Sequence, residues 1–384
     1  MPATPFAISL PEQRLQSIRD RIVGFDWDAF PDAGNWSAGI AKAEMRRIAD
    51  YWVHDYDWRA AEALLNTQPH FMAVVEGIGI HFLHVKGSAP GRRPPLLLIH
   101  GWPGSFLEFE RCIERLAHPE RFGGNAEDGF DLVIPSLPGF GLSGRPAAPI
   151  GPRAIARLFN RLMTEVLGYS HYVSQGGDWG SVIASWIAHD QSEACVALHL
   201  NMCLLQNTKA TPETEEQKAY LAHVNLMRMI EGGYAHQQGT RPQTLGFALA
   251  DSPVGAAAWI LEKFAAWSDL DRNGSEPRLE SVYTLDQLLT NIMLYVGTGN
   301  IVTSTWIYKA VGEEGAPGLE HRVTVPTGVA AFPDPVFPPP PRSYAEQSFA
   351  VTRWTQMAKG GHFAAMEQPE AFADDLRAFV LSLG

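Results

Sequence analysis

Residues 171–188, HYVSQGGDWGSVIASWIA, combine an apolar strand, a glycine-rich turn and a helix. We predict the strand over residues 171–175, the turn over 176–180 and the helix directly after it. Small residues stand two positions before and two positions after Asp178. They permit the sharp strand-to-helix turn called a nucleophile elbow, because larger side chains would clash where the chain folds back. The alternative interpretation is an ordinary glycine-rich turn in which Asp178 caps the helix.

The rest of the chain alternates between strands and helices. Two continuous apolar runs end in loops rich in Gly and Pro, LLLIHGWPG (96–104) and FDLVIPSLPG (130–139), which is typical of parallel strands buried on both faces. Further strands are expected over a hairpin at 71–85 and over 195–200, 325–332 and 349–354, and helices over 153–167 and 369–383. The sequence therefore predicts an α/β fold with a mostly parallel sheet flanked by helices.

This pattern divides the chain into four segments. Residues 1–90 form an N-terminal segment, helical up to about residue 70 and wrapped on a neighbour, followed by the first strands. Residues 91–206 form the first part of the core. In residues 207–320 the alternation gives way to helical patterns rich in Ala, Leu and Met, which favours a lid inserted into the core. Residues 321–384 complete the core.

The composition excludes several classes of protein. Apolar residues make up 46% of the 384 residues and charged residues 19%, as in a globular domain. The net charge of -12 repels phosphate backbones, so nucleic acid is not an expected partner. Three unpaired cysteines and the lack of a signal-peptide pattern indicate a cytoplasmic protein. No apolar run reaches the length of a membrane anchor, so we expect a soluble protein.

The elbow residue indicates the type of reaction. A carboxylate at this position attacks carbon and gives an alkyl ester, unlike the serine of an esterase. The loop His100-Gly101-Trp102 follows the strand at 96–99, and such a loop supplies one backbone N–H of an oxyanion hole, while the residue after the nucleophile supplies the other. The predicted donors are therefore the backbones of Trp102 and Trp179. A simple turn at the end of a strand is the alternative for this loop.

The other two catalytic positions follow from chain order. His362, in GGHF (360–363), lies downstream of the elbow, where the general base is expected, and its imidazole can activate water. The acid that orients the base should lie between the two, and Asp334 in FPDP (332–335) is the candidate. An Asp in a turn between two prolines is the competing interpretation. No spacing of side chains predicts a metal site, and no organic cofactor is expected.

Over nearly its whole length the chain resembles epoxide hydrolases of the microsomal type within the α/β-hydrolase superfamily. The resemblance is carried by LPEQRLQSIRDRI (10–22), HGWPGS (100–105), GGDWGS (176–181) and GGHFAAMEQPE (360–370). It implies an α/β-hydrolase fold with a helical lid. It also implies that Asp178 is the nucleophile and that His362 is the base.

The resemblance further implies two lid tyrosines that bind and protonate the epoxide oxygen. They correspond to Tyr234 and Tyr308, with Tyr295 as the rival of the second. A phenol can hold the developing oxyanion and supply a proton at neutral pH. One position departs from the family pattern: the acid usually stands two residues after Phe-Pro, where this chain has Pro335, and the only carboxylate here is one residue earlier, at Asp334.

We therefore expect a hydrolase that converts a small hydrophobic epoxide and water to a vicinal diol through an aspartyl ester, with Trp102 and Trp179 also lining the substrate site. A haloalkane dehalogenase would use the same Asp178 and His362, with the two indoles holding halide. A binding protein that has lost activity on the same fold is a further alternative. The oligomeric state is open, and a homodimer is one option.

Overall fold

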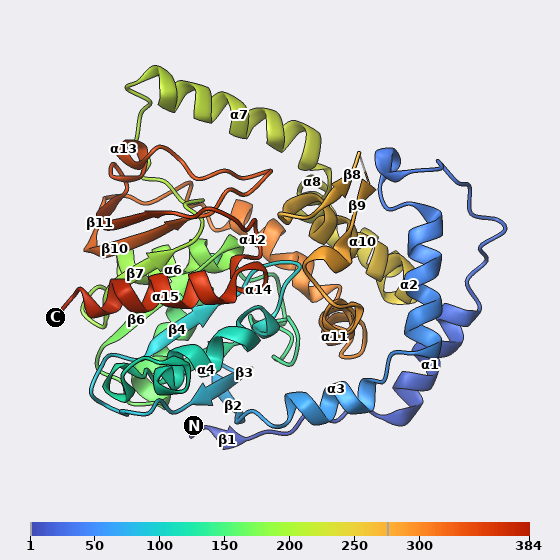
Figure 1. Ribbon diagram of the computed structural model, residues 1–384, viewed down its shortest axis with the longest axis horizontal. Coiled ribbons are helices and arrows are strands. Elements are labelled where there is room, and N and C mark those ends of the chain that lie inside the picture. Colours follow the sequence, from blue (N-terminus) through green and yellow to red (C-terminus); the bar gives the residue numbers. More distant parts are fainter. Residues whose placement is uncertain (1, 275) are drawn as a thin grey trace.

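The protein is described by a computed structural model that covers residues 2–274 and 276–384 and is built on a nine-stranded sheet (Figure 1). The strand order is β1-β2-β3-β5-β4-β6-β7-β10-β11. The strands are β1 (Thr4–Pro5), β2 (His70–Val75), β3 (Ile78–Val85), β4 (Leu96–Ile99), β5 (Leu132–Pro135), β6 (Tyr172–Gly176), β7 (Cys195–Leu200), β10 (Val323–Ala331) and β11 (Phe349–Gln356). From β5 to β11 neighbouring strands run parallel, whereas β1, β2 and β3 are antiparallel at one edge. The predicted mostly parallel sheet is confirmed.

Helices flank the parallel strands and explain their continuous apolar runs. Every residue of β4, β5 and β6 is buried, as expected for strands covered on both faces. Helices α4 (Glu110–Ala117) and α15 (Pro369–Leu381) pack against each other (Figure 1). Helix α5 (Pro152–Arg161) packs against α6 (Asp178–Asp190). Helix α6 contacts β4, β6, β7 and β10, so its first residue lies at the carboxyl end of the central strands.

Between β7 and β10 the chain forms a largely helical region. Its helices are α7 (Glu215–Glu231), α8 (Gly233–Thr240), α9 (Pro242–Asp251), α10 (Pro253–Trp267), α11 (Leu285–Val296) and α12 (Trp306–Glu313). Local signals start two of them: the Ser252 hydroxyl caps α10, and Thr284 with Gln287 forms a capping box at α11. The short antiparallel strands β8 (Arg272–Asn273) and β9 (Glu276–Pro277) in this region were not predicted.

The N-terminal helices lie along this helical region rather than on the sheet (Figure 1). They are α1 (Glu12–Val23), α2 (Lys42–His54) and α3 (Trp58–Leu65), and they contact α10 and α11. Arg14 donates hydrogen bonds to the carbonyl oxygens of Val296 and Gly297 at the end of α11. The segment therefore ties the start of the chain to the helices that cover the sheet.

The apolar helices of this region were compared with the length and hydropathy of a membrane-spanning helix. Among the described residues, no single helix is long and apolar enough to cross a membrane. The pair α9 and α10 reaches the required length and hydropathy only together, and the two helices are bent by 116° at Ser252.

Asp375 fastens the last helix to the sheet. Its carboxylate accepts hydrogen bonds from Arg353 Nε at 2.8 Å and from the Thr355 hydroxyl at 2.6 Å on β11, and it lies 3.2 Å from Nε2 of His199 on β7. Burial opposes the charge, but the contacts with His199, Thr355 and Arg353 outweigh it and lower the pKa of Asp375 to about 2. This cluster holds α15, which is separated from the loop of His362 only by the short helix α14 (Ala364–Glu367).

We predict that Asp375→Asn lowers the free energy of unfolding by about 2 kcal/mol at pH 7, measured by urea denaturation, because it removes the counter-ion of the half-buried Arg353 and weakens the contact with the buried His199. The folded-state pKa of Asp375 lies below the ordinary value of 3.8, so its contribution is complete above about pH 4 and is lost as the pH falls toward 2. The difference between wild type and variant should shrink over that range. The exposed neighbour Asp374 is the control, since Asp374→Asn should change stability little.

Candidate active site

The turn after β6 holds Asp178 in an unusual backbone conformation. Asp178 has φ of +47°, in the left-handed region, and is the first residue of α6. Gly176 and Gly180 are required because backbone atoms come too close to leave room for a side chain. A Cβ on Gly176 would lie 2.1 Å from the carbonyl oxygen of Gly180, and a Cβ on Gly180 would lie 1.9 Å from the carbonyl oxygen of Ile99. The strained turn lifts the Asp178 carboxylate above the carboxyl end of the sheet.

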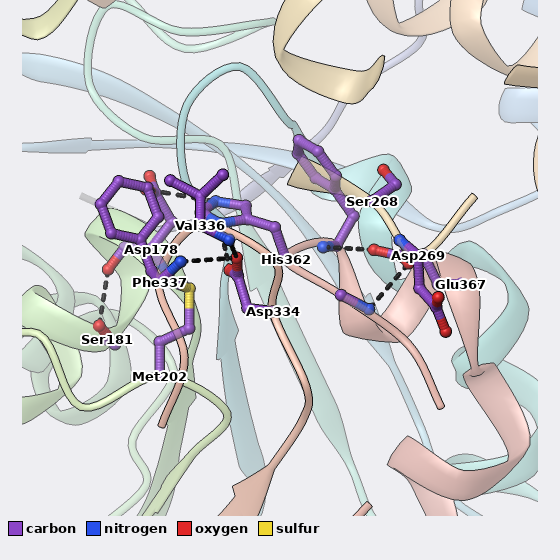
Figure 2. Close-up of polar contacts among 12 residues, drawn as sticks. Asp178, Ser181, Met202, Ser268, Asp269, Asp334, Val336, Phe337, His362 and Glu367 are labelled. Atoms are coloured by element: carbon purple, nitrogen blue, oxygen red, sulfur yellow. Dashed lines mark hydrogen bonds and ion pairs between the residues drawn. The ribbon is translucent and has the colours of Figure 1, made fainter. Parts of the chain in front are cut away.

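The Asp178 carboxylate is held by backbone and side-chain groups of three elements. Its Oδ1 accepts a hydrogen bond from the backbone N–H of Trp102 at 2.8 Å, and its Oδ2 lies 3.4 Å from Nε2 of His362. The Asp178 N–H donates to the sulfur of Met202, after β7, at 3.3 Å (Figure 2). Trp179 is the second residue of α6, in the first turn, where backbone N–H groups have no partner within the helix. The Trp102 N–H is thus in place as one donor at Oδ1 of Asp178, and the Trp179 N–H lies free of helix partners one residue after Asp178.

His362 lies between two carboxylates (Figure 2). Its Nδ1 is 3.0 Å from Oδ2 of Asp334, and its Nε2 faces Asp178. The other Asp334 oxygen accepts the backbone N–H groups of Val336 and Phe337, each at 2.8 Å, which fixes the carboxylate despite its shifted position in the sequence. Burial lowers the pKa of His362, but its contacts with the two carboxylates outweigh burial and raise the pKa above its ordinary value.

Glu367 clamps the loop that carries His362. Its carboxylate accepts backbone N–H groups from Gly361 and Asp269, each at 2.8 Å, and from Phe363 at 2.9 Å. The His362 N–H in turn donates to the carbonyl oxygen at the end of α10. Glu367 belongs to the segment 360–370 that carries the family resemblance, but its role was not predicted from the sequence.

Glu108 was also not assigned from the sequence. Its carboxylate lies against the oxyanion loop, where Oε1 is 3.4 Å from the Gly101 N–H and would be 1.8 Å from a Cβ on Gly104. Burial is the main cause that raises the pKa of Glu108 to about 8. The signal that could have identified it is its position seven residues after Gly101, on the turn that follows the loop.

Four aromatic side chains enclose the Asp178 carboxylate. Tyr234 stacks on Trp102, with ring centres 5.3 Å apart and planes 10° from parallel. Tyr308 meets Trp179 edge to face at 4.8 Å, and the two tyrosine rings are 5.7 Å apart. The structure thus brings together both tyrosines and both tryptophans that were singled out in the sequence.

Several polar atoms of this cage are buried without a partner. Within residues 2–274 and 276–384, the buried side-chain atoms that make no hydrogen bond include Nε1 of Trp102, Nε1 of Trp179 and the hydroxyl oxygen of Tyr308. Buried polar groups are normally hydrogen-bonded, so unpaired donors around a carboxylate mark a place for a polar atom of a ligand. Burial, followed by the neighbouring Tyr234 and Asp178, raises the pKa of Tyr308 well above its ordinary value. Burial and Asp178 also raise that of Tyr234, so both phenols hold their protons at neutral pH.

Tyr295, the alternative to Tyr308 as the second lid tyrosine, uses its hydroxyl in a contact with the backbone. Its hydroxyl donates a hydrogen bond to the carbonyl oxygen of Gly104, and Nδ2 of Asn291 donates to that of Pro103 at 2.8 Å. Both residues belong to α11, so this helix supports the loop that carries Trp102. In the described part of the chain, no group of three or more His, Cys, Asp or Glu side chains is arranged to hold a metal ion.

Comparisons with known proteins show which family the chain is similar to. Residues 3–109 match the family model described as the epoxide hydrolase N terminus, and residues 94–243 match the model of the alpha/beta hydrolase fold. Epoxide hydrolase 1 of Oryctolagus cuniculus is 36% identical over 402 residues, covering 98% of this chain and 88% of that protein.

Two solved structures are similar over almost the whole chain. Juvenile hormone epoxide hydrolase from the silkworm Bombyx mori is 30% identical with a TM-score of 0.87, covering 99% of this chain and 94% of that one. The epoxide hydrolase of Aspergillus niger is 29% identical with a TM-score of 0.85, covering 100% and 97%. The resemblance seen in the sequence is confirmed: the chain belongs to the epoxide hydrolase family, with that family's N-terminal region ahead of an α/β-hydrolase fold, and it is an enzyme of that class.

Proposed function

We propose that this epoxide hydrolase converts hydrophobic epoxides to vicinal diols in two steps, through a covalent ester on Asp178. The observation that carries the proposal is the convergence of an elbow carboxylate, an imidazole 3.4 Å from it and two protonated phenols in one aromatic cage. A carboxylate that displaces oxygen from carbon needs an acid on the opposite side of the reacting carbon. Tyr234 and Tyr308 are suited to supply it.

In the first step, Oδ2 of Asp178 attacks one epoxide carbon, and the C–O bond of the ring breaks. Tyr234 and Tyr308 bind the departing oxygen, and one of them transfers its proton to it. The N–H of Trp102 holds Oδ1, which becomes the carbonyl oxygen of the ester. The two buried phenols stabilise the oxyanion in a site from which water is largely excluded.

In the second step, His362 takes a proton from water, and the resulting hydroxide attacks the ester carbonyl carbon. The backbone N–H groups of Trp102 and Trp179 stabilise the tetrahedral oxyanion, which collapses to release the diol and regenerate Asp178. Alkylation itself prepares His362 for this task. It turns one of the two carboxylates that raise the pKa of His362 into a neutral ester, so the imidazolium can release its proton, which restores the phenol left deprotonated by the first step. The neutral imidazole then acts as the base, and the proton that it takes from water returns it to its starting state.

The walls of the site favour an apolar substrate. The rings of Trp102, Trp179, Tyr234 and Tyr308 pack on one another beside Asp178, and Trp267 packs against Tyr234 at 5.2 Å. Aromatic walls bind apolar groups mainly by removing their surface from water. The two tyrosines favour an epoxide over a haloalkane, because halide needs donors but no proton.

A single turnover with excess enzyme in oxygen-18 water tests the mechanism directly. With an aryl epoxide as the substrate, water enters the ester carbonyl, so label must appear in the peptide that contains Asp178. Diol without label in that peptide would contradict the covalent mechanism, because water would then attack the epoxide itself. Failure to turn over any aryl or alkyl epoxide would move the assignment to haloalkanes.

Variants at the nucleophile and the base should separate the two steps. Asp178→Ala should abolish turnover while leaving the thermal unfolding curve in place. His362→Gln should block the second step, so that intact-protein mass spectrometry finds the enzyme plus one substrate. The exposed Asp374→Ala is the folded control. Turnover by Asp178→Ala, or no adduct on His362→Gln, would contradict the assigned roles.

The two tyrosines should contribute to the first step alone. We expect Tyr234→Phe and Tyr308→Phe each to slow ester formation by about 100-fold, the usual range for loss of a general acid. Pre-steady-state tryptophan fluorescence follows this step, since Trp102 and Trp179 line the site. Tyr220→Phe, on α7, is the matched control. An unchanged alkylation rate in both site variants would exclude the tyrosines as proton donors.

Glu367 should act through the position of His362. Glu367→Gln replaces one acceptor oxygen by an NH₂ group that faces backbone N–H donors, which costs about 1–3 kcal/mol of stability. We expect slower ester hydrolysis with little change in the alkylation rate, because the base is displaced and the nucleophile is not. Glu370→Gln, three residues away and exposed, should change neither rate. Equal slowing of both steps would indicate a general loss of structure instead.

A further inference from the structure

A buried lysine lies against the ring of one of the two site tyrosines. Lys263 of α10 is 6% exposed, and its Nζ lies 4.8 Å from the centre of the Tyr234 ring and 5.7 Å from that of Trp267. Lysine is rarely buried to this extent unless its ammonium is paired. Here Glu262 lies 2.6 Å away and Glu231 3.9 Å away, so the ammonium has counter-ions and also faces a ring.

We propose that Lys263 is a positioning residue that makes Tyr234 the stronger proton donor of the pair during ring opening. The inference rests on the proposed function, since it assigns Tyr234 a neighbour that acts on its acidity. The proposal also gives the two phenols different strengths as proton donors, whereas the sequence predicts the same role for both. Both phenols have aromatic neighbours, but the ammonium of Lys263 faces the ring of Tyr234.

The physical argument concerns the charge that develops on the phenol. As Tyr234 gives its proton to the epoxide oxygen, negative charge spreads from the phenol oxygen into the ring. A cation over the ring attracts the neutral ring weakly and the phenolate ring strongly. Because the attraction grows along the reaction, it lowers the barrier instead of only tightening substrate binding.

The other charges around Tyr234 act in the opposite direction. Burial, Asp178, Asp334 and Glu231 all raise the pKa of Tyr234, and its contact with Tyr308 lowers it. Glu262 is paired with the lysine. Without a nearby cation, a phenol surrounded by carboxylates would be a poor acid. The ammonium of Lys263 therefore offsets an environment that is otherwise unfavourable for proton donation.

The contact with Trp267 makes a second route conceivable, because Trp267 packs on His362 with ring centres 4.7 Å apart. The two routes differ in the step that they affect. An effect through Tyr234 changes ester formation, whereas an effect through Trp267 and His362 changes ester hydrolysis. Measurement of both rate constants distinguishes them.

The test compares full-length wild type with Lys263→Met, which keeps an unbranched side chain but removes its charged end, and with Lys263→Arg, which keeps the charge. With styrene oxide as the probe, single-turnover fluorescence gives the alkylation and hydrolysis rate constants. We expect Lys263→Met to slow alkylation by about 10-fold with unchanged hydrolysis and substrate Kd, and Lys263→Arg to restore most of the rate. Lys218→Met, an exposed lysine of α7, is the matched control.

A double-mutant cycle identifies the residue through which the lysine acts. In a Tyr234→Phe background, Lys263→Met should have no further effect on alkylation, because the phenol is already absent. A fluorotyrosine at position 234, which is a stronger acid, should rescue Lys263→Met. Lys263→Gln is the second neutral variant if the methionine is not tolerated in the fold.

Each outcome decides the proposal. Equal alkylation rates in wild type and in a folded neutral variant would overturn it, and so would the same 10-fold loss in the Tyr234→Phe background. A lower rate constant for ester hydrolysis with an unchanged alkylation rate would also overturn it, because Lys263 would then act through Trp267 and His362. If the proposed two-step function were wrong, the wild-type enzyme itself would form no ester with styrene oxide. That result differs from every outcome that overturns the role of Lys263 alone.

Discussion

The left-handed backbone of Asp178 is the constraint on which the site depends. It requires glycine at positions 176 and 180, because the turn brings backbone atoms within about 2 Å of any added Cβ. In return, the carboxylate stands at the end of the central strand, within reach of the Trp102 N–H and of His362. Without this turn, the Asp178 carboxylate would not lie between the loop of Trp102 and the loop of His362.

The helices over the sheet position the loops as well as cover them. Helix α11 holds the oxyanion loop through Asn291 and Tyr295. The carbonyl oxygen of Trp267, the last residue of α10, accepts the His362 N–H, and Asp269 just after α10 accepts the Gly360 N–H. The N-terminal helices pack on α10 and α11, and Arg14 caps the end of α11. The N-terminal segment therefore stabilises the active site indirectly, through two helices that each touch a catalytic loop.

Local patterns predicted most of the sheet. Every strand of the parallel part was expected from its apolar run, because such a run is a local signal that four to nine residues suffice to carry. The strands that were missed, β1, β8 and β9, have two residues each, which is too short for any period. For β1 the pairing partner is Met72, 68 positions along the chain, and no local pattern encodes such a pair.

The sequence by itself determined the turn at Asp178 and the chain order of the candidate residues, because both depend on neighbours within a few positions. Only the tertiary structure decided that the Asp334 carboxylate reaches His362 and that the Tyr295 hydroxyl is used by a loop carbonyl. It alone brought Lys263 onto the ring of Tyr234. The reason is physical: these contacts join segments up to 191 residues apart, and their geometry is set by how helices pack rather than by the residues beside them in the chain.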